Sequence, residues 1–237
     1  MGLFDIFSGK KALKQTGILN GFCDNHIHLL PGVDDGIQSM DDALELLGIM
    51  ETAGVKTVWC TPHVMEDIPN KTDFLKMHFE KLKSLYKGEI ELHLAAEYMI
   101  DSLFQERLEK DDLLVHANNH VLVESSTVSA PYGFKNTLKE LMHKGHYVLL
   151  AHPERYRFLE KKDYVELKEM KIRFQLNLTS LLGLYGPAVK EKAEKLLSEG
   201  FYEAVGTDTH RVKRWQQMEE QKISKKIIKQ VSEIQGL

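Results

Sequence analysis

The chain lacks the features that mark several classes of protein. Its 237 residues include two cysteines, Cys23 and Cys60, so no disulfide framework is implied and a reducing cytoplasm is expected. No run of about 18 apolar residues occurs, so no membrane span is predicted. The net charge of −4 argues against a nucleic-acid partner, which favours a basic excess. No linker rich in glycine, serine or proline divides the chain, and we expect one large domain.

The N-terminus carries a short apolar stretch from Met1 to Phe7. Lysines follow this stretch rather than precede it, which argues against a signal peptide, and Ile6 breaks the myristoylation pattern. We expect residues 1–20 to form an N-terminal extension that packs on a domain of residues 21–237. A weak contact with a membrane surface or a partner is the alternative.

Apolar runs rich in β-branched residues alternate with segments of helical period. Strands are predicted at residues 21–28, 55–61, 90–97, 120–124, 147–152, 172–177 and 204–208, and helices at 40–53, 73–86, 136–143, 187–199 and 215–234. This alternation favours a parallel sheet, and about seven β–α units favour its closure into a TIM-like barrel. In such barrels, the catalytic groups lie at the C-terminal ends of the strands.

Metal-ligand residue types occur where these strands should end. His26 and His28 lie two positions apart on a strand and therefore face the same side. A carboxylate that closes an apolar strand needs a cation, which is either a basic side chain or a metal ion. Imidazole and carboxylate together suit Zn, Mn or Fe, so a metal-dependent hydrolase is predicted. The strand-end candidates are His26, His28, His63, Glu97, Glu124, His152, Asp208 and His210.

Two neighbouring aspartates in the first loop, Asp34 and Asp35, precede Gly36. They form a turn, or one of them reaches the metal-binding face. The histidines in helical, mid-strand or loop positions are expected to be structural: His78, His93, His116, His120, His143 and His146.

Arginines near the strand ends offer binding for an anion. Arg155 suits a phosphate clamp, because its guanidinium is planar and always charged. The alternative is a surface ion pair of Arg155 with Glu154 or Glu160. Arg211 and Arg214 receive an anionic substrate or lie in a solvated loop.

Other phosphatase chemistries find no support in the sequence. A cysteine phosphatase needs an arginine six positions after its cysteine, but Leu29 and Glu66 occupy those positions. No nucleophile elbow and no Walker loop occur.

Taken together, these residues resemble the polymerase-and-histidinol-phosphatase (PHP) superfamily. The resemblance is strongest to its branch of manganese-dependent protein-tyrosine phosphatases, which are encoded with bacterial capsule and exopolysaccharide genes. The matching stretches run from about residue 20 to residue 215: Asp24-Asn25-His26-Ile27-His28, Val33-Asp34-Asp35-Gly36, Thr61-Pro62-His63, Ala96-Glu97-Tyr98, Leu122-Val123-Glu124, Ala151-His152-Pro153-Glu154-Arg155-Tyr156 and Asp208-Thr209-His210.

The resemblance implies a distorted (β/α)7 barrel that binds three divalent ions, manganese first, with iron, zinc or cobalt as alternatives. It implies one ion on His26, His28, Glu97 and Asp208, a second on Glu97, Glu124 and His152, and a third on Asp35, His63 and His210. Asp35 rather than Asp34 follows from the family's spacing. Arg155, Arg211 and His152 are the candidate catalytic residues. The N-terminal extension departs from the family pattern.

We therefore expect a cytoplasmic protein-tyrosine phosphatase that uses metal-activated water. By the resemblance, its substrate is a bacterial tyrosine autokinase that regulates capsule synthesis. One alternative is a phosphoesterase for histidinol phosphate, another small phosphomonoester or a nucleotide phosphodiester. The other is a non-enzymatic, metal-bound module that binds a kinase or a membrane partner. The native metal and the oligomeric state stay open.

Overall fold

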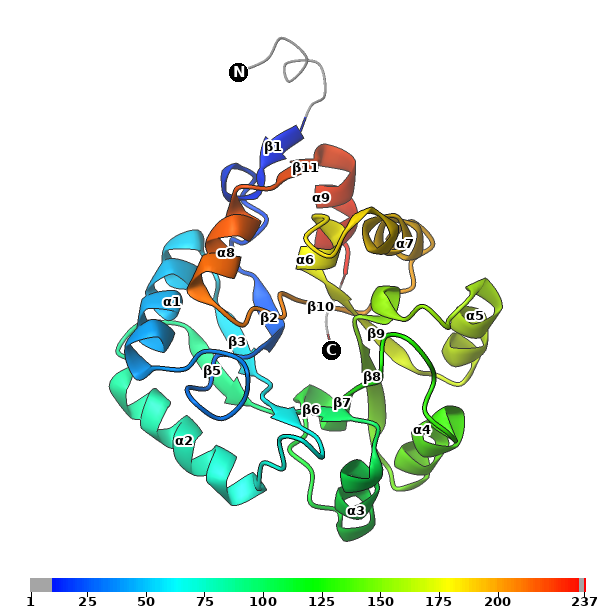
Figure 1. Cartoon of the computed structure of the whole chain (residues 1–237). Coiled ribbons are helices and arrows are strands. Elements are labelled where there is room, and N and C mark those ends of the chain that lie inside the picture. Colours follow the sequence, from blue (N-terminus) through cyan, green and yellow to red (C-terminus); the bar gives the residue numbers. More distant parts are fainter. Residues whose placement is uncertain (1–9, 235–236) are drawn as a thin grey trace.

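The computed structural model describes residues 10–234 and 237 (Figure 1). The strands are β1 (Lys10–Ala12), β2 (Cys23–Ile27), β3 (Thr57–Cys60), β4 (His63–Val64), β5 (Glu91–Leu94), β6 (Glu97–Met99), β7 (His120–Glu124), β8 (Tyr147–Ala151), β9 (Arg173–Asn177), β10 (Ala204–Gly206) and β11 (Lys222–Ser224). The helices are α1 (Met40–Ala53), α2 (Thr72–Leu85), α3 (Ser102–Lys110), α4 (Phe134–His143), α5 (Lys161–Glu169), α6 (Leu178–Leu181), α7 (Pro187–Ser198), α8 (Val212–Glu219) and α9 (Lys225–Ser232).

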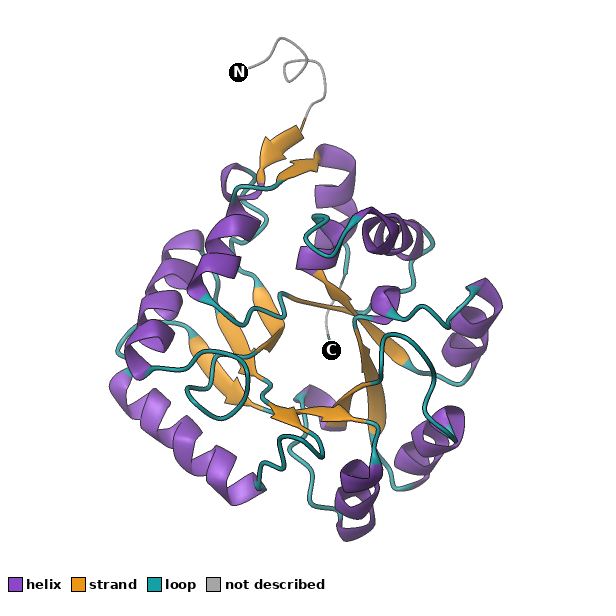
Figure 2. Ribbon diagram, in the orientation of Figure 1, coloured by secondary structure: helices purple, strands orange, loops and turns teal. Residues whose placement is uncertain are grey.

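The strands curl into a ring that the helices surround (Figure 2). Parallel pairing joins β2-β3-β5 in one sheet and β4-β6-β7-β8-β9-β10 in another. The chain passes from β3 to β4 through Thr61 and Pro62, and from β5 to β6 through Ala95 and Ala96. With each of these pairs counted as one broken strand, the ring holds the seven strands that the sequence predicts. The predicted distorted barrel is confirmed.

Side chains help to close the ring between β10 and β2. Asp24 is fully buried and accepts hydrogen bonds from the backbone N of Thr207 at 2.9 Å and from its Oγ1 at 2.6 Å. The backbone N of Asp208 donates to the carbonyl oxygen of His26 at 2.7 Å. Each of these contacts joins residues about 180 positions apart in the sequence. Together they hold the end of β2 beside the end of β10.

Local signals explain the helix boundaries. In α1, Ser39 accepts a hydrogen bond from the backbone N of Asp42 at 3.1 Å, which satisfies one of the free donors of the first turn. Gly54 ends the helix with a φ of 97°, a conformation that favours glycine. The buried side chains of α1 recur with helical spacing and cover the strands: Ala43, Leu46, Leu47 and Met50.

The prediction of one helix over residues 215–234 is wrong. The segment forms α8, β11 and α9, because β11 pairs antiparallel with β1 and buries Ile223. Helical periodicity cannot reveal a partner strand at the other end of the chain. No helix is predicted from the sequence at α3, α5 or the four-residue α6 either.

Part of the predicted N-terminal extension packs on the barrel. β1 pairs with β11, and Leu13 is fully buried. The expectations for Met1 to Phe7 lie outside the described residues, and the division at residue 20 stays a prediction. Among the described residues, none of the helices combines the length and the apolar character that a membrane span needs.

Candidate metal centre

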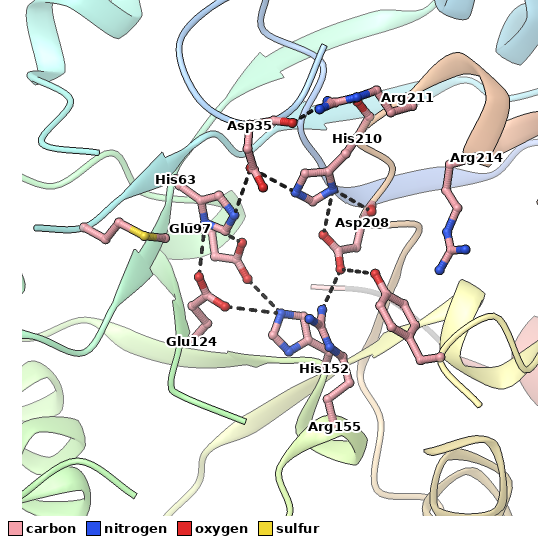
Figure 3. A pocket seen from close by; sticks show the side chains of 12 residues that line it. Asp35, His63, Glu97, Glu124, His152, Arg155, Asp208, His210, Arg211 and Arg214 are labelled. Atoms are coloured by element: carbon pink, nitrogen blue, oxygen red, sulfur yellow. Dashed lines mark hydrogen bonds and ion pairs between the residues drawn. The ribbon is translucent and has the colours of Figure 1, made fainter. Parts of the chain in front are cut away.

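An open cavity of about 510 Å³ lies where the C-terminal ends of the barrel strands meet (Figure 3). Seven of the nine predicted metal ligands line it, and the other two, His26 and His28, are fully buried beside Glu97 and Asp208. Glu97 and His63 begin β6 and β4 rather than ending a strand, because the strands that carry them are broken. The lining residues are Asp35, His63, Met65, Glu97, Glu124, His152, Arg155, Tyr185, Asp208, His210, Arg211 and Arg214.

The first cluster of ligand-type atoms comprises His26, His28, Glu97 and Asp208. The Nε2 atoms of His26 and His28 lie 3.1 Å and 3.3 Å from Oε2 of Glu97. The same Nε2 atoms lie 3.5 Å and 3.3 Å from Oδ1 of Asp208. The four residues are those that the family resemblance implies for the first ion.

The second cluster shares Glu97 with the first. Glu124 Oε1 lies 3.1 Å from His63 Nδ1, which in turn lies 3.2 Å from Glu97 Oε2. His152 Nε2 lies 2.9 Å from the other oxygen of Glu97 and 3.7 Å from Oε2 of Glu124. The ligand-type atoms that lie together here belong to His63, Glu97 and Glu124. His63 thus stands where the resemblance implies His152, which contacts both glutamates from the edge of the cluster.

The third cluster comprises His28, Asp35, His63 and His210. Oδ1 of Asp35 lies 3.3 Å from His210 Nε2 and 3.6 Å from His63 Nε2. Asp35 therefore faces this cluster, and the family's spacing predicted the same choice. His28 is the one residue here that the prediction assigned only to the first ion.

Carboxylates reverse the effect of burial on these imidazoles. Burial alone would lower the pKa of His26, but the charges of Glu97 and Asp208 raise that pKa to about 9. Burial would raise the pKa of Glu97, but His26 and His63 hold it well below its usual range. Glu97 is therefore held in its ionised form. This suits a cation.

Several buried polar atoms of the centre lack a hydrogen bond. They are Glu97 Oε2, His63 Nδ1 and His152 Nδ1, and the first two are in close contact only with other ligand-type atoms. Buried polar atoms are otherwise almost always hydrogen-bonded. The clusters could hold metal ions, and these free atoms fit such a site.

Neighbouring side chains orient the ligands from behind. His26 Nδ1 donates to Gln175 Oε1 at 2.9 Å, and His28 Nδ1 donates to Asp34 Oδ2 at 2.8 Å, so both rings present Nε2 to the carboxylates. Asp34 also accepts from the backbone N of His63 at 3.0 Å. Asp34 thus supports the ligands, while its neighbour Asp35 faces the third cluster.

The backbone is strained at two of the candidate ligands. His152 has a φ of 35° and Asp208 a φ of 51°, in the left-handed region that residues other than glycine rarely adopt. Such strain costs about 1–3 kcal/mol for each residue and is concentrated at functional sites. Both residues directly follow or closely follow a barrel strand, where the strain turns their side chains into the cavity.

The three arginines take different positions. Arg155 forms an ion pair with Asp208 Oδ2 at 2.8 Å, so the alternative of a pair with Glu154 or Glu160 is wrong. Arg211 donates from Nη1 to the carbonyl oxygens of Asp35 and Gly36, and so fastens the loop that carries Asp35. Arg214 donates from Nη2 to the carbonyl oxygen of Leu184 at 3.2 Å.

Sequence reasoning missed three polar residues of this centre. Gln175 and Asn177 are fully buried and lie two apart on β9, a spacing that places both on one face and could have revealed them. Asn177 Nδ2 donates to Asp208 Oδ2 at 2.8 Å. Tyr185 lies on the loop between α6 and α7, and its hydroxyl donates to the same oxygen at 3.2 Å. No pattern in the sequence marks Tyr185.

Two bacterial tyrosine-protein phosphatases are similar to this chain over most of its length. The tyrosine-protein phosphatase YwqE of Bacillus subtilis is 28% identical over 197 residues, which are 80% of this chain and 78% of that protein. The tyrosine-protein phosphatase CpsB of Streptococcus pneumoniae is 25% identical over 201 residues, which are 79% of this chain and 82% of that protein.

The same relatives appear among solved structures. One chain from the crystal structures of YwqE and CpsB, described as unique metal-dependent tyrosine phosphatases, has a TM-score of 0.74 at 25% identity and covers 91% of this chain and 88% of its own. The model of the family "Capsular polysaccharide synthesis, CpsB/CapC" matches residues 22–234. The chain therefore belongs to the CpsB/CapC family, the capsule branch that its motifs resemble.

Proposed function

We propose that this protein is a metal-dependent protein-tyrosine phosphatase. The observation that carries the proposal is the meeting of three clusters of histidine and carboxylate in one open cavity, where His28, His63 and Glu97 each belong to two clusters. The relatives that share this fold are described as metal-dependent tyrosine phosphatases. A phosphorylated tail of a bacterial tyrosine kinase is the substrate that the family's link to capsule synthesis favours.

The proposed ion sites are those that the family resemblance implies, and the clusters support them in most of their members. One divalent ion binds His26, His28, Glu97 and Asp208; a second binds Glu97, Glu124 and His152; and a third binds Asp35, His63 and His210. We favour manganese, although imidazole and carboxylate also accept iron, zinc and cobalt. Bound divalent ions supply Lewis acidity and lower the pKa of water toward neutrality.

The charged side chains of the cavity have different roles toward the ions and the phosphate. Four carboxylates, Asp35, Glu97, Glu124 and Asp208, offset four of the six charges of three divalent ions, which leaves a net positive site for a phosphate dianion. Arg155 lines the cavity beside Asp208, where its guanidinium can stabilise charge on the phosphoryl oxygens. Arg211 acts differently, because its bonds to the Asp35 loop orient a ligand.

The leaving group favours an aryl phosphate. Tyrosine leaves as a phenolate whose conjugate acid has a pKa of about 10, so it needs less help from a general acid than an alkoxide does. The cavity is also open to the surface, so a residue carried on a polypeptide can enter it. Histidinol phosphate, an alkyl phosphate, is the competing substrate.

The test measures phosphate release from a phosphotyrosine peptide and from histidinol phosphate, with and without added Mn²⁺. The wild-type protein is compared with His152→Ala and with His143→Ala, a histidine at the end of α4 outside the cavity. We expect metal-dependent release from the peptide that is lost only in His152→Ala. Preference for histidinol phosphate would assign a small-molecule substrate, and no release from either would favour a binding module.

A further inference from the structure

Tyr185 joins the two arginines of the cavity to a candidate metal ligand. The guanidinium carbons of Arg155 and Arg214 lie 4.5 Å and 4.9 Å from the centroid of its ring. Its hydroxyl donates to Asp208 Oδ2, which also accepts from Arg155 Nη1 at 2.8 Å. One half-buried side chain thus contacts residues from the end of β8, from α8 and from the end of β10.

The two guanidinium groups differ in their charge partners. The charge of Arg155 is paired with Asp208. Among the described residues, no ion pair engages Arg214, which is held by the carbonyl oxygen of Leu184 and by the ring of Tyr185. Both of these supports lie on the loop between α6 and α7. Arg214 therefore offers an unpaired positive charge to the cavity that it lines (Figure 3).

A free arginine side chain has several rotatable bonds, and fixing it for a ligand costs rotamer entropy. Stacking on an aromatic face is favourable by a comparable free energy. An aromatic ring that already holds the guanidinium therefore removes most of that cost before the substrate arrives. A leucine at position 185 would fill space without this attraction.

We propose that Tyr185 is a positioning residue whose ring holds Arg155 and Arg214 ready for the phosphoryl group of the substrate. The proposal rests on the proposed phosphatase function for its substrate. The ring of Tyr185, rather than its hydroxyl, sets how tightly the cavity binds a phosphate. Because two guanidinium groups already contact the ring, Tyr185 acts through the arginines rather than by stacking on the substrate.

The test compares Tyr185→Phe, which keeps the ring, with Tyr185→Leu, which removes it. Each variant is loaded with Mn²⁺, and the binding of inorganic phosphate is measured by calorimetry beside KM and kcat for the phosphotyrosine peptide. We expect Tyr185→Leu to weaken phosphate binding and raise KM about 10-fold, with a smaller change in kcat. Tyr185→Phe should stay within about 3-fold of the wild type. Tyr147→Leu is the matched control, because Tyr147 begins β8 and is 57% exposed.

The double variant Tyr185→Leu/Arg214→Ala separates positioning from a general structural role. If the ring acts through Arg214, Tyr185→Leu costs clearly less in the Arg214→Ala background than in the wild type. Equal costs in the two backgrounds would overturn the proposal, as would a Tyr185→Phe effect as large as that of Tyr185→Leu. Phosphate binding also reports on Tyr185 if the peptide is not a substrate, so failure of the proposed function and failure of this inference are distinguishable.

Discussion

Two groups of buried histidines in this protein lie in opposite electrostatic surroundings. In the candidate metal centre, His26 is fully buried, and neighbouring carboxylates raise its pKa to about 9. Outside the cavity, His116 is only 2% exposed and stacks on Trp59 with ring centroids 3.8 Å apart. Burial there is not opposed by a buried carboxylate, and the pKa of His116 falls to about 3.

The contrast shows that burial does not decide what a histidine does here. Both rings are removed from water, and both belong to the interior of one barrel. Trp59 also stacks on the half-buried His93 at 4.5 Å, so aromatic stacking joins the members of the second group. The first group pairs each imidazole with carboxylates, so metal ions binding there must displace protons. The companions of a histidine, rather than its burial, mark the candidate metal centre.

The largest expected effect follows from removing the carboxylate that the clusters share. Glu97 lies within 3.3 Å of His26, His28, His63 and His152. Loss of a residue that only supports a metal ligand costs up to roughly 100-fold in activity. We expect Glu97→Gln to lower phosphate release by more than this, because the variant loses a ligand that two ions share. The metal content of the purified variant, measured by elemental analysis, should fall as well.

The matched control for this variant makes the same change in the second group. Glu91 lies 3.1 Å from His93 Nε2, but its side chain is 69% exposed. Glu91→Gln should leave metal content and phosphate release unchanged. Full metal content and activity in Glu97→Gln would show that the clusters do not bind the ions that we assign to them.

A smaller effect is expected at Asp34, which orients His28 without facing the clusters. Asp34→Asn keeps the shape of the side chain and removes its charge. Loss of such a supporting carboxylate typically weakens metal affinity or activity about 10–100-fold. Calorimetric titration of the metal-free protein with Mn²⁺ measures this change. Asp35→Asn is the comparison and should instead lower the number of ions bound. The reverse pattern would make Asp34 the ligand.

The sequence predicted the parts of this site that obey a local rule. Several barrel strands, such as β7 and β8, are largely apolar, and the parallel fold brings the ends of the strands to one side. The position of His152 and Asp208 at strand ends, facing one cavity, is therefore predictable without a structure. The choice between Asp34 and Asp35 is different, because neighbouring carboxylates look alike in sequence. Family spacing pointed to Asp35, and the structure adds that Asp34 faces His28 instead.

Contacts between distant segments could not be predicted. β11 forms because β1, more than 200 residues earlier, offers a partner strand, and a helical pattern of charges hid this pairing. Tyr185 lies on a loop with no periodicity, so only the structure shows that it meets Arg155, Arg214 and Asp208. Residues whose role depends on tertiary neighbours leave no mark in the local sequence.

The smallest expected effect concerns His116, the neutral histidine that lies outside the cavity. Its pKa is about 3 in the folded protein and about 6.5 when unfolded. Between these values the unfolded chain binds a proton that the folded chain does not, so stability is lost as the pH falls below about 6.5. From about pH 7.5 to about pH 5.5, this one residue should lower the free energy of unfolding by about 1.4 kcal/mol.

The variant His116→Gln removes this contribution. It should be less stable than the wild type at about pH 7.5, because the stacking on Trp59 is lost. The difference between the two proteins should then shrink by about 1.4 kcal/mol at about pH 5.5. Urea unfolding of both proteins at the two pH values measures it, and the pH dependence of metal binding cancels because both carry the same metal centre. If the stability difference between the two proteins stays constant with pH, His116 gains a proton as easily in the folded state as in the unfolded chain. Burial without a carboxylate would then not explain the contrast between the two groups of histidines.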